Sequence, residues 1–436
     1  MKYIVFAVSV VTCFLPSIMA DTLTLDVALV RALEHDERIE IQRRDVDIAG
    51  QEVSRAWTIV SPRLTVSGQY ERPEEEIRRE EQVVVPEDNW RATITASQPL
   101  FDGRVLPARR LGLALQEAEA FILARTIQGV LFDVTRLYYD VLSASKQVSV
   151  AEQTVALARE EVRRARARFE AGEARRTEVL RAEVDESRAI RNQVLARNAH
   201  ALAQSELARR IGWAADEGFN VADPESGGEP FVLEAESSAA DWYPAAYEHR
   251  YDLAGLRAQL RAAEEQHTVI RREAWPTLEL QYNHRFVEPE SFTTRNNFWE
   301  VAAVARFEFW DGGNRRISRR QQGERIVQSE LRIADLEKAV QLEVQQARLE
   351  LLTMRENIVS LRREVTLAEE NYRTLSEQAR VGLATSLDVS TALTALDSVR
   401  TELARAEYDL AVAHQRFLFV TGDFARDYVT VERKAD

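Results

Sequence analysis

The chain has 436 residues, of which 45% are hydrophobic and 29% charged, and its formal net charge is −14. This composition is too apolar for an intrinsically disordered protein, and the acidic balance argues against a nucleic-acid partner. The length alone is typical of two or three domains.

Residues 1–20 are typical of a secretory signal peptide. Lys2 supplies a positive start, an apolar run extends from Ile4 to Leu15, and Ala20 is a suitable small residue for the cleavage site. The alternative is an uncleaved N-terminal anchor. The only cysteine, Cys13, lies in this segment, so we expect a mature chain without disulfides or cysteine metal ligands. No later segment has 18 consecutive apolar residues, and any membrane span is therefore expected to be a β-barrel.

The mature sequence repeats itself with a period of about 210 residues. Such a period is too long for a solenoid and predicts a duplicated structural unit. We expect a first repeat over residues 21–221, a linker over 222–243, a second repeat over 244–423 and a tail over 424–436. The matching landmarks are Glu34–Asp36 with Glu248–Arg250, Pro62–Val66 with Pro276–Leu280, Phe101–Gly103 with Trp310–Gly312, Gly172 with Gly382, and Ile211–Gly212 with Thr421–Gly422.

Each repeat is predicted to begin with one helix, Leu25–Ile59 in the first and Pro244–Ala274 in the second. Two strands follow in each repeat, at about 62–72 and 90–100, and at about 276–287 and 298–309. Polar and apolar residues alternate along all four segments, which is the pattern of outer-membrane strands. A soluble antiparallel sheet with one wet face is the alternative. The charged connection at 72–89 suits an extracellular loop.

Four strands are too few to close a membrane barrel, and lipid does not tolerate the two open edges. The sequence therefore predicts an oligomer that shares one barrel. Two copies would give eight strands and three would give twelve. We favour three, because the charged side chains of the polar face need room inside the pore. The residues predicted to line the lumen are Arg91, Glu279, Arg285, Glu300 and Glu308.

A long helical hairpin is predicted at the end of each repeat, at about 104–213 and 314–421. The first helix of each hairpin has about 65 residues and would extend roughly 100 Å at 1.5 Å per residue. Apolar residues recur along these helices at helical spacing, which is typical of coiled coils. Gly172 and Gly382 mark the two reversals, where a positive φ angle turns a helix back.

The ordered set of these features resembles the TolC family of outer-membrane efflux channels. The resemblance is carried by LTLDVALVRALEHDERI (23–39), SQPLFDGR (97–104), FEFWDGGN (307–314), RVGLATSLDVSTAL (380–393) and the duplication. It implies an α+β membrane protein: a trimer whose 12-stranded outer-membrane β-barrel, with four strands per protomer, continues into a periplasmic α-helical barrel. An inner-membrane transporter and a periplasmic adaptor are the implied partners.

The same resemblance assigns two tasks to the hairpin tips. Family members constrict the pore with acidic rings, and by motif position Glu178 and Asp388 are the matching carboxylates. The alternative is that both acids stabilise helix N-termini, which is compatible with a gate. The tips are also the expected docking surface for the adaptor, although Glu173, Arg175 and Arg176 depart from the small or apolar residues usual there. The docking residues so implied are Gly172, Arg175, Arg176, Val381, Gly382, Leu383, Ala384 and Ser386.

No enzyme motif occurs in the sequence: there is no P-loop, no G-x-S-x-G and no H-E-x-x-H. We therefore expect neither a catalytic site nor a cofactor nor a metal. The function predicted is a passive exit duct of tripartite efflux or type I secretion. The rival is a periplasmic coiled-coil scaffold or adaptor without a pore, and an enzyme is the weakest possibility. The transported cargo does not follow from the sequence.

Overall fold

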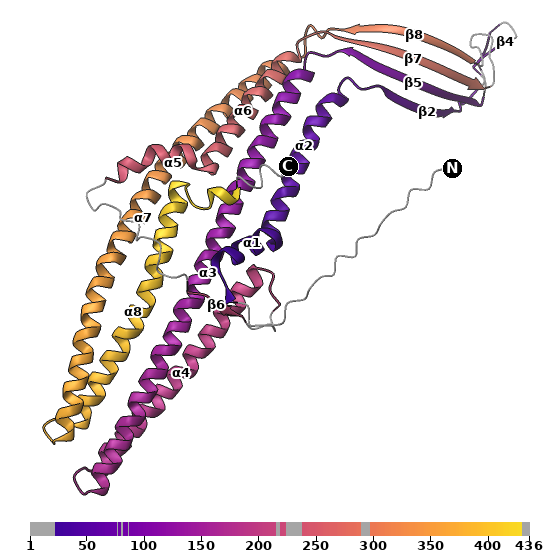
Figure 1. Ribbon diagram of the computed structural model, residues 1–436. Helices are drawn as coiled ribbons and strands as arrows, with labels where there is room; N and C mark the ends of the chain where they lie inside the picture. The colour runs from indigo at the N-terminus through magenta and orange to yellow at the C-terminus, as the bar shows by residue number, and fades with distance from the viewer. Residues whose placement is uncertain are drawn as a thin grey trace, which may run out of the picture. The chain divides into compact units, whose positions relative to one another are not determined.

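The computed structural model describes residues 22–75, 77–79, 82–85, 87–214, 219–223, 238–288 and 297–429 (Figure 1). The predicted signal peptide, most of the predicted linker and residues 430–436 lie outside the described residues. The chain forms two compact units, and each unit draws on both sequence repeats. Among the described residues, unit 1 lies within 22–36, 130–223 and 347–417, and unit 2 lies within 37–129, 238–346 and 418–429.

Unit 2 contains a four-stranded antiparallel sheet with the order β2-β5-β7-β8, which Figure 1 shows as four long arrows side by side. Strands β2 and β8 form its edges. Strand β8 ends three residues before the predicted 309, because the chain leaves the sheet there for the turn into the next helix. Glu308 therefore lies outside the sheet. The strands are β2 (Arg63–Glu71), β5 (Asn89–Phe101), β7 (Thr277–Glu288) and β8 (Asn297–Arg306).

The register of the strands gives the sheet one polar and one apolar face. Thr95 pairs with Thr65 on one side and with Asn283 on the other, and Asn283 pairs with Glu300. Because side chains directly opposite one another point to the same face, these polar positions share one side of the sheet. The other side carries Leu64, Val66, Tyr70, Ala92, Ile94, Ala96, Leu278, Leu280, Tyr282, Phe286, Trp299, Val301 and Ala303.

Four further strands are short. Strands β3 (Ile77–Arg79) and β4 (Gln82–Val85) pair with each other inside the connection that was predicted as a loop. In unit 1, β1 (Thr22–Leu23) pairs in parallel with β6 (Asn220–Val221). This second pair ties the start of the described chain to the segment after the first hairpin.

The prediction of one helix at the start of each repeat is wrong, because each is broken into two. The first is α1 (Leu25–His35) and α2 (Glu37–Thr58). The second is α5 (Tyr243–His249), preceded by the short η1 (Ala239–Trp242), and α6 (Tyr251–Arg272).

The breaks fall at the repeat equivalents Asp36 and Arg250, whose backbones are extended, with ψ angles of 118° and 121°. Both side chains are buried and charged, and both find charged partners. Arg210 lies 3.6 Å from Asp36, and Arg250 contacts Asp252 at 2.6 Å and Glu343 at 2.5 Å. A buried charge needs such pairing, and a continuous helix would not place these groups in the same positions.

Each break packs against the glycine that ends the hairpin of its own repeat. A Cβ atom on Gly212 would lie 2.8 Å from the His35 side chain, and one on Gly422 would lie 2.8 Å from the His249 backbone. Both glycines have positive φ angles, 63° and 85°. Two of the landmarks within each repeat, the helix break and the glycine that ends the hairpin, are therefore in contact in the fold.

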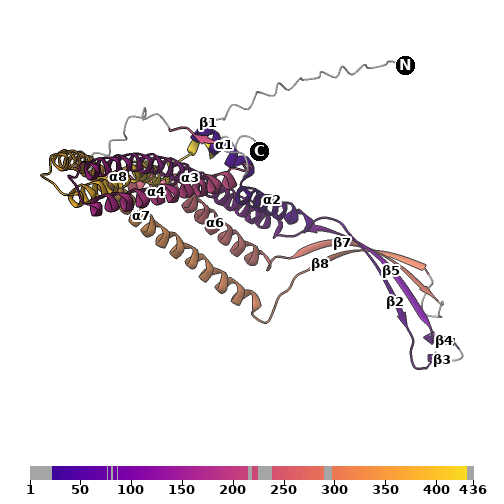
Figure 2. The same ribbon diagram turned by 90° about the horizontal axis from the view of Figure 1, so that it is seen from below.

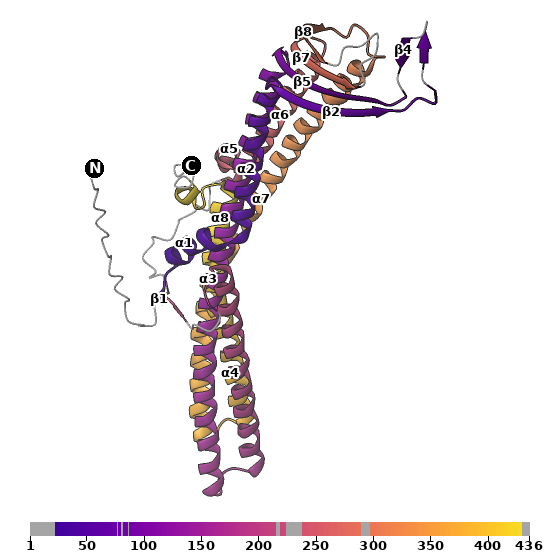
Figure 3. The same cartoon turned by 90° about the vertical axis from the view of Figure 1, so that its right-hand side faces the viewer.

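The two hairpins are formed by α3 (Val105–Glu170) with α4 (Arg176–Arg210) and by α7 (Asn314–Arg380) with α8 (Ser386–Thr421). In unit 1 the four helices lie alongside one another, as Figures 2 and 3 show. Small and medium apolar side chains allow this close packing. One cluster contains Val155, Ala158, Ala189 and Leu393, and a second contains Ile358, Leu361, Val399 and Ala406.

We predict that Gly422→Ala destabilises the protein more than Gly172→Ala does. Both glycines have positive φ angles, which costs an alanine about 1–2 kcal/mol. A methyl group at Gly172 meets open space, whereas one at Gly422 meets the His249 backbone. Thermal unfolding of the two variants measures the difference, and equal shifts in Tm would contradict it.

Candidate functional site at the helical hairpin tips

The two hairpin tips of unit 1 have the same backbone geometry. Gly172 and Gly382 have φ angles of 79° and 78°, which confirms the predicted positive φ at both reversals. At the first tip, the Glu173 N–H donates to the Arg168 carbonyl at 2.8 Å. At the second, the Leu383 N–H donates to the Gln378 carbonyl at 2.9 Å. These six-to-one bonds are Schellman motifs, which satisfy the last carbonyls of α3 and α7.

The two predicted gate acids occupy equivalent positions three residues after the helix cap. The Glu178 carboxylate accepts the Arg175 N–H at 3.4 Å, and Arg168 lies 3.8 Å from its other oxygen. The Asp388 carboxylate accepts the Thr385 N–H at 2.8 Å and the Thr385 hydroxyl at 2.6 Å. Both acids therefore start their helices as capping groups. Whether they also constrict a pore stays a prediction.

Hydrogen bonds from Thr385 lower the pKa of the Asp388 carboxyl. The hydroxyl and the N–H of Thr385 both favour the charged form of the carboxylate and lower its pKa below the ordinary 3.8. Because the folded-state pKa is the lower one, this group stabilises the fold above its ordinary pKa. That contribution is lost as the pH falls through the folded-state pKa.

The chemistry of the two tips differs although their backbones match. The second tip exposes apolar side chains: Val381 is 64% exposed, Leu383 79% and Leu387 51%. The first tip exposes Glu173, Arg175 and Arg176 instead. The second tip is thus an apolar surface and the first is a charged one.

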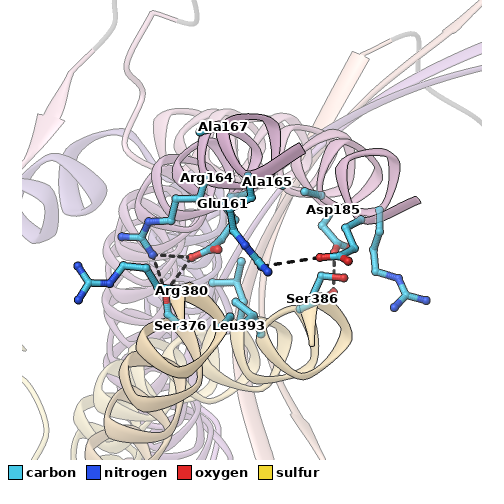
Figure 4. A pocket seen from close by; sticks show the side chains of 17 residues that line it. Glu161, Arg164, Ala165, Ala167, Asp185, Ser376, Arg380, Ser386 and Leu393 are labelled. Atoms are coloured by element: carbon cyan, nitrogen blue, oxygen red, sulfur yellow. Dashed lines mark hydrogen bonds and ion pairs between the residues drawn. The ribbon is translucent and has the colours of Figure 1, made fainter. Parts of the chain in front are cut away.

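A cavity of about 270 Å³ lies between the two hairpins behind the tips (Figure 4). Buried alanine, valine and leucine side chains form its apolar wall, and charged side chains from α3, α4 and α7 line the rest. The small alanines leave the space open, because they cannot fill the gap between four helices. Its lining includes Ala158, Ala379, Val389 and Leu393 with Glu161, Arg164, Arg168, Glu178, Arg181, Asp185 and Arg380.

Polar contacts bind the first hairpin to the second beside this cavity. Oε1 of Glu161 on α3 accepts the Tyr372 hydroxyl and the Ser376 hydroxyl of α7, each at 3.0 Å. Arg164 contacts the same carboxylate at 3.1 Å and also donates to Ser376, as the dashed lines of Figure 4 show. Burial and the Glu161 charge raise the pKa of Tyr372, so its hydroxyl stays protonated and donates.

Two further bonds join the hairpins. The Ser390 hydroxyl of α8 donates to Asp185 of α4, and the Thr154 hydroxyl of α3 donates to Asp397 of α8, each at 2.5 Å. Sequence reasoning missed all of these contact residues. The available signal was weak: Glu161, Ser376 and Thr154 are polar residues at helical positions that otherwise carry apolar side chains.

Four of the five residues predicted to line a lumen share the polar face of the unit 2 sheet, namely Arg91, Glu279, Arg285 and Glu300. Asn283 donates to Glu300 at 3.2 Å, and Arg285 lies 3.6 Å from the same carboxylate. Glu308 lies beyond β8, and its backbone carbonyl accepts a hydrogen bond from Arg315 at 2.7 Å. The polar network crosses from strand to strand, but its place inside a pore stays a prediction.

In the described part of the chain, no group of three or more His, Cys, Asp or Glu side chains is placed to hold a metal ion. No helix there combines the length and the apolar character needed to cross a membrane.

Comparisons with known proteins agree with one another. The family model for outer membrane efflux proteins matches the chain twice, over residues 28–213 and 242–423. The outer membrane efflux protein BepC of Brucella suis is 24% identical over 419 residues, which cover 94% of this chain and 87% of BepC. The alkaline protease secretion protein AprF of Pseudomonas aeruginosa is 27% identical over 346 residues, which cover 77% and 70%.

The fold agrees with a solved structure as well. The outer membrane channel CmeC of Campylobacter jejuni superposes with a TM-score of 0.77 at 13% identity, and the match covers 94% of this chain and 88% of CmeC. The two matches of the family model also confirm that the chain is internally duplicated.

We predict that Thr385→Val raises the pKa of Asp388 toward its ordinary value, because the variant loses one of two donors to the carboxylate. A carboxyl-carbon NMR titration of protein with labelled aspartate measures this. Thr391→Val is the matched control, since the Thr391 hydroxyl donates to the Leu387 carbonyl and not to Asp388. An unchanged pKa in Thr385→Val would show that the hydroxyl has no such role.

The double variant Tyr372→Phe, Ser376→Ala is expected to loosen the contact between α3 and α7. It removes two donors from one carboxylate, a loss of about 2 kcal/mol. Hydrogen–deuterium exchange should become faster near Glu161 and near Ser376. Thr366→Val is the control, because the Thr366 hydroxyl bonds within its own helix. Equal exchange in both variants would mean that these bonds do not hold the hairpins together.

Proposed function

This chain belongs to the outer membrane efflux protein family, and as such it is an outer-membrane channel of efflux or type I secretion; we propose that three copies form one passive exit duct. In this proposal the strands cross the outer membrane and the helical hairpins extend into the periplasm. An inner-membrane transporter and a periplasmic adaptor complete the machine and supply its energy. The chain itself contributes no catalysis.

The observation that carries the proposal is the open four-stranded sheet. Its polar face holds a connected network of charges and amides, and its other face is apolar. In lipid, the unpaired backbone groups of β2 and β8 would each cost several kcal/mol. Pairing β8 of one copy with β2 of the next removes this cost. Three copies give twelve strands, with the polar face around the lumen and the apolar face toward lipid.

The first hairpin supports the same assembly. One face of α4 in unit 1 carries apolar residues at helical spacing that remain largely exposed, and part of this face borders an open groove beside α8. A run of exposed apolar side chains on one helix face is typical of a surface that another chain contacts. These residues are Leu180, Val184, Val194, Leu195 and Leu202, and each is about half exposed or more.

We assign adaptor docking to both tips, with a different chemistry at each. The second tip offers Val381, Leu383 and the turn at Gly382, a surface suited to an apolar partner. Ala384 and Ser386 are small and allow close approach. The first tip offers Arg175 and Arg176, which suit an acidic partner. Docking there is expected to depend more strongly on salt.

Glu178 and Asp388 are proposed as the acidic gate. Three copies of each carboxylate near one axis would repel one another, attract cations and disfavour anions. The capping bonds fix where these charges lie, because the carboxylates are held at the first turns of α4 and α8. The gate and the helix cap are thus two roles of the same groups.

We expect a small, cation-selective single-channel conductance for the purified protein in a planar bilayer. Glu178→Ala and Asp388→Ala should each weaken the cation preference or enlarge the conductance, because each removes three charges from the constriction. Glu377→Ala is the control, since Glu377 is an exposed acid near the second tip that the gate does not include.

The outcomes separate the claims. A conducting protein with indifferent gate variants would keep the duct and discard Glu178 and Asp388 as its gate. Well-folded protein that neither inserts nor conducts would overturn the duct and favour a periplasmic scaffold. Native mass spectrometry of the same sample tests the trimer directly.

A further inference from the structure

The two ends of the four-stranded sheet carry opposite charge. The four junctions between helix and strand, residues 55–63, 102–110, 271–276 and 306–325, hold thirteen arginines and five acidic residues. The connection at the other end, residues 71–89, holds eight acidic residues and three arginines. The basic end is an exception in a chain with a net charge of −14.

Trp275 lies at the basic end of the sheet and packs closely against its neighbours. The Trp275 ring stacks on Phe101 with centroids 6.4 Å apart, and the site of a Cβ on Gly103 lies only 2.9 Å from that ring. Only glycine at position 103 lets the ring lie this close to the backbone. Trp275 is nevertheless 49% exposed. The ring therefore packs against Phe101 and Gly103 and is exposed over the rest of its surface.

A bulge in β5 places this cluster on the apolar face. Up to Pro99 the odd-numbered residues of β5 lie on the polar face, but the register shifts between Pro99 and Phe101. Phe101 then pairs with Leu278, which belongs to the apolar face. The apolar face therefore ends at a stacked aromatic pair, Phe101 and Trp275.

Positively charged side chains lie at the end of α6 next to this aromatic pair. The guanidinium of Arg272 lies 5.1 Å from the Trp275 ring centroid and donates to the Gly103 carbonyl at 3.2 Å. Arg271 lies in the last turn of α6 and is exposed, and it forms no ion pair in the described part of the chain. Arg63 and Arg306 are also unpaired there, but the register places them on the polar face. Arg272 thus places positive charge beside the aromatic end of the apolar face, and Arg271 adds a second positive charge in the same last turn of α6.

We infer that Trp275, Arg272 and Arg271 bind the headgroup phosphate of an anionic phospholipid in the periplasmic leaflet of the outer membrane. The inference rests on the proposed function, which places the apolar face in lipid and its basic end toward the periplasm. Tryptophan prefers the membrane–water interface, and guanidinium groups bind phosphate oxygens through paired hydrogen bonds. An anionic lipid adds attraction to the junction arginines that a zwitterionic lipid does not.

Brominated lipids test the site, because bromine on an acyl chain quenches a nearby tryptophan. The protein is placed in nanodiscs of phosphatidylcholine with a fraction of brominated phosphatidylglycerol or brominated phosphatidylcholine. Trp275→Phe identifies the part of the emission that comes from Trp275. We expect phosphatidylglycerol to be preferred about fivefold near Trp275, and the preference to approach unity in Arg271→Gln, Arg272→Gln protein.

Arg261→Gln is the matched control, because Arg261 lies on the same helix and is paired with Glu117 at 2.6 Å. It should keep the preference. Arg271→Gln alone should reduce it, and this exposed residue is not needed for folding. Equal quenching by the two lipids in the wild type, or the same preference in the double variant, would overturn the inference. Relief of the preference by millimolar inorganic phosphate would mean a free-anion site, and the lipid assignment would be wrong.

Conductance measured on the same protein separates this inference from the proposed function. A conducting channel without lipid preference rejects the lipid site alone. Protein that neither conducts nor inserts rejects the duct, and the lipid site with it.

Discussion

Backbone hydrogen bonding at the sheet edges constrains the protein more than any single side chain does. A four-stranded sheet leaves the outward-facing backbone donors and acceptors of its edge strands β2 and β8 unpaired, and lipid offers no water to satisfy them. The remaining features agree with an assembly that resolves this conflict. Polar side chains collect on one face, exposed apolar residues line α4, and the chain provides a long helical hairpin in each repeat.

The duplication preserves backbone geometry and lets side chains diverge. Both tips end α3 and α7 in the same Schellman motif, and both following helices begin with a capping acid. Yet the cap partner is the Arg175 backbone in one repeat and the Thr385 side chain and backbone in the other. Different side chains on matched backbones give one chain two chemically distinct tips. A protein with a single repeat would need a second gene to supply the second kind of tip.

Much of this fold could be predicted because its signals are local. The strands follow from alternation at residues such as Leu64, Thr65 and Val66, and the reversals follow from Gly172 and Gly382. The breaks at Asp36 and Arg250 were not predictable. They depend on partners such as Arg210 and Glu343, which lie far away in the sequence and become neighbours only in the fold.

The residues of the candidate site also fall into two groups, those that local sequence signals predict and those that depend on partners distant in the sequence. Glu178 and Asp388 stand at recognisable distances from the tip glycines, so their position follows from the sequence. Glu161, Tyr372 and Ser376 do not stand out, because one polar residue on a helix gives no hint of its partner. The bulge at Pro99 is similar: simple alternation assigns Phe101 to the polar face, and only the shifted register corrects this.

The capping bonds of Glu178 and Asp388 also bear on how such a chain changes over generations. Each carboxylate satisfies backbone donors that would otherwise be left open at the start of a helix. Loss of either acid would therefore weaken the tip even in a channel that never discriminated between ions. Selection for folding alone would therefore keep a side-chain hydrogen-bond acceptor at these two positions, whatever the ions or molecules that pass.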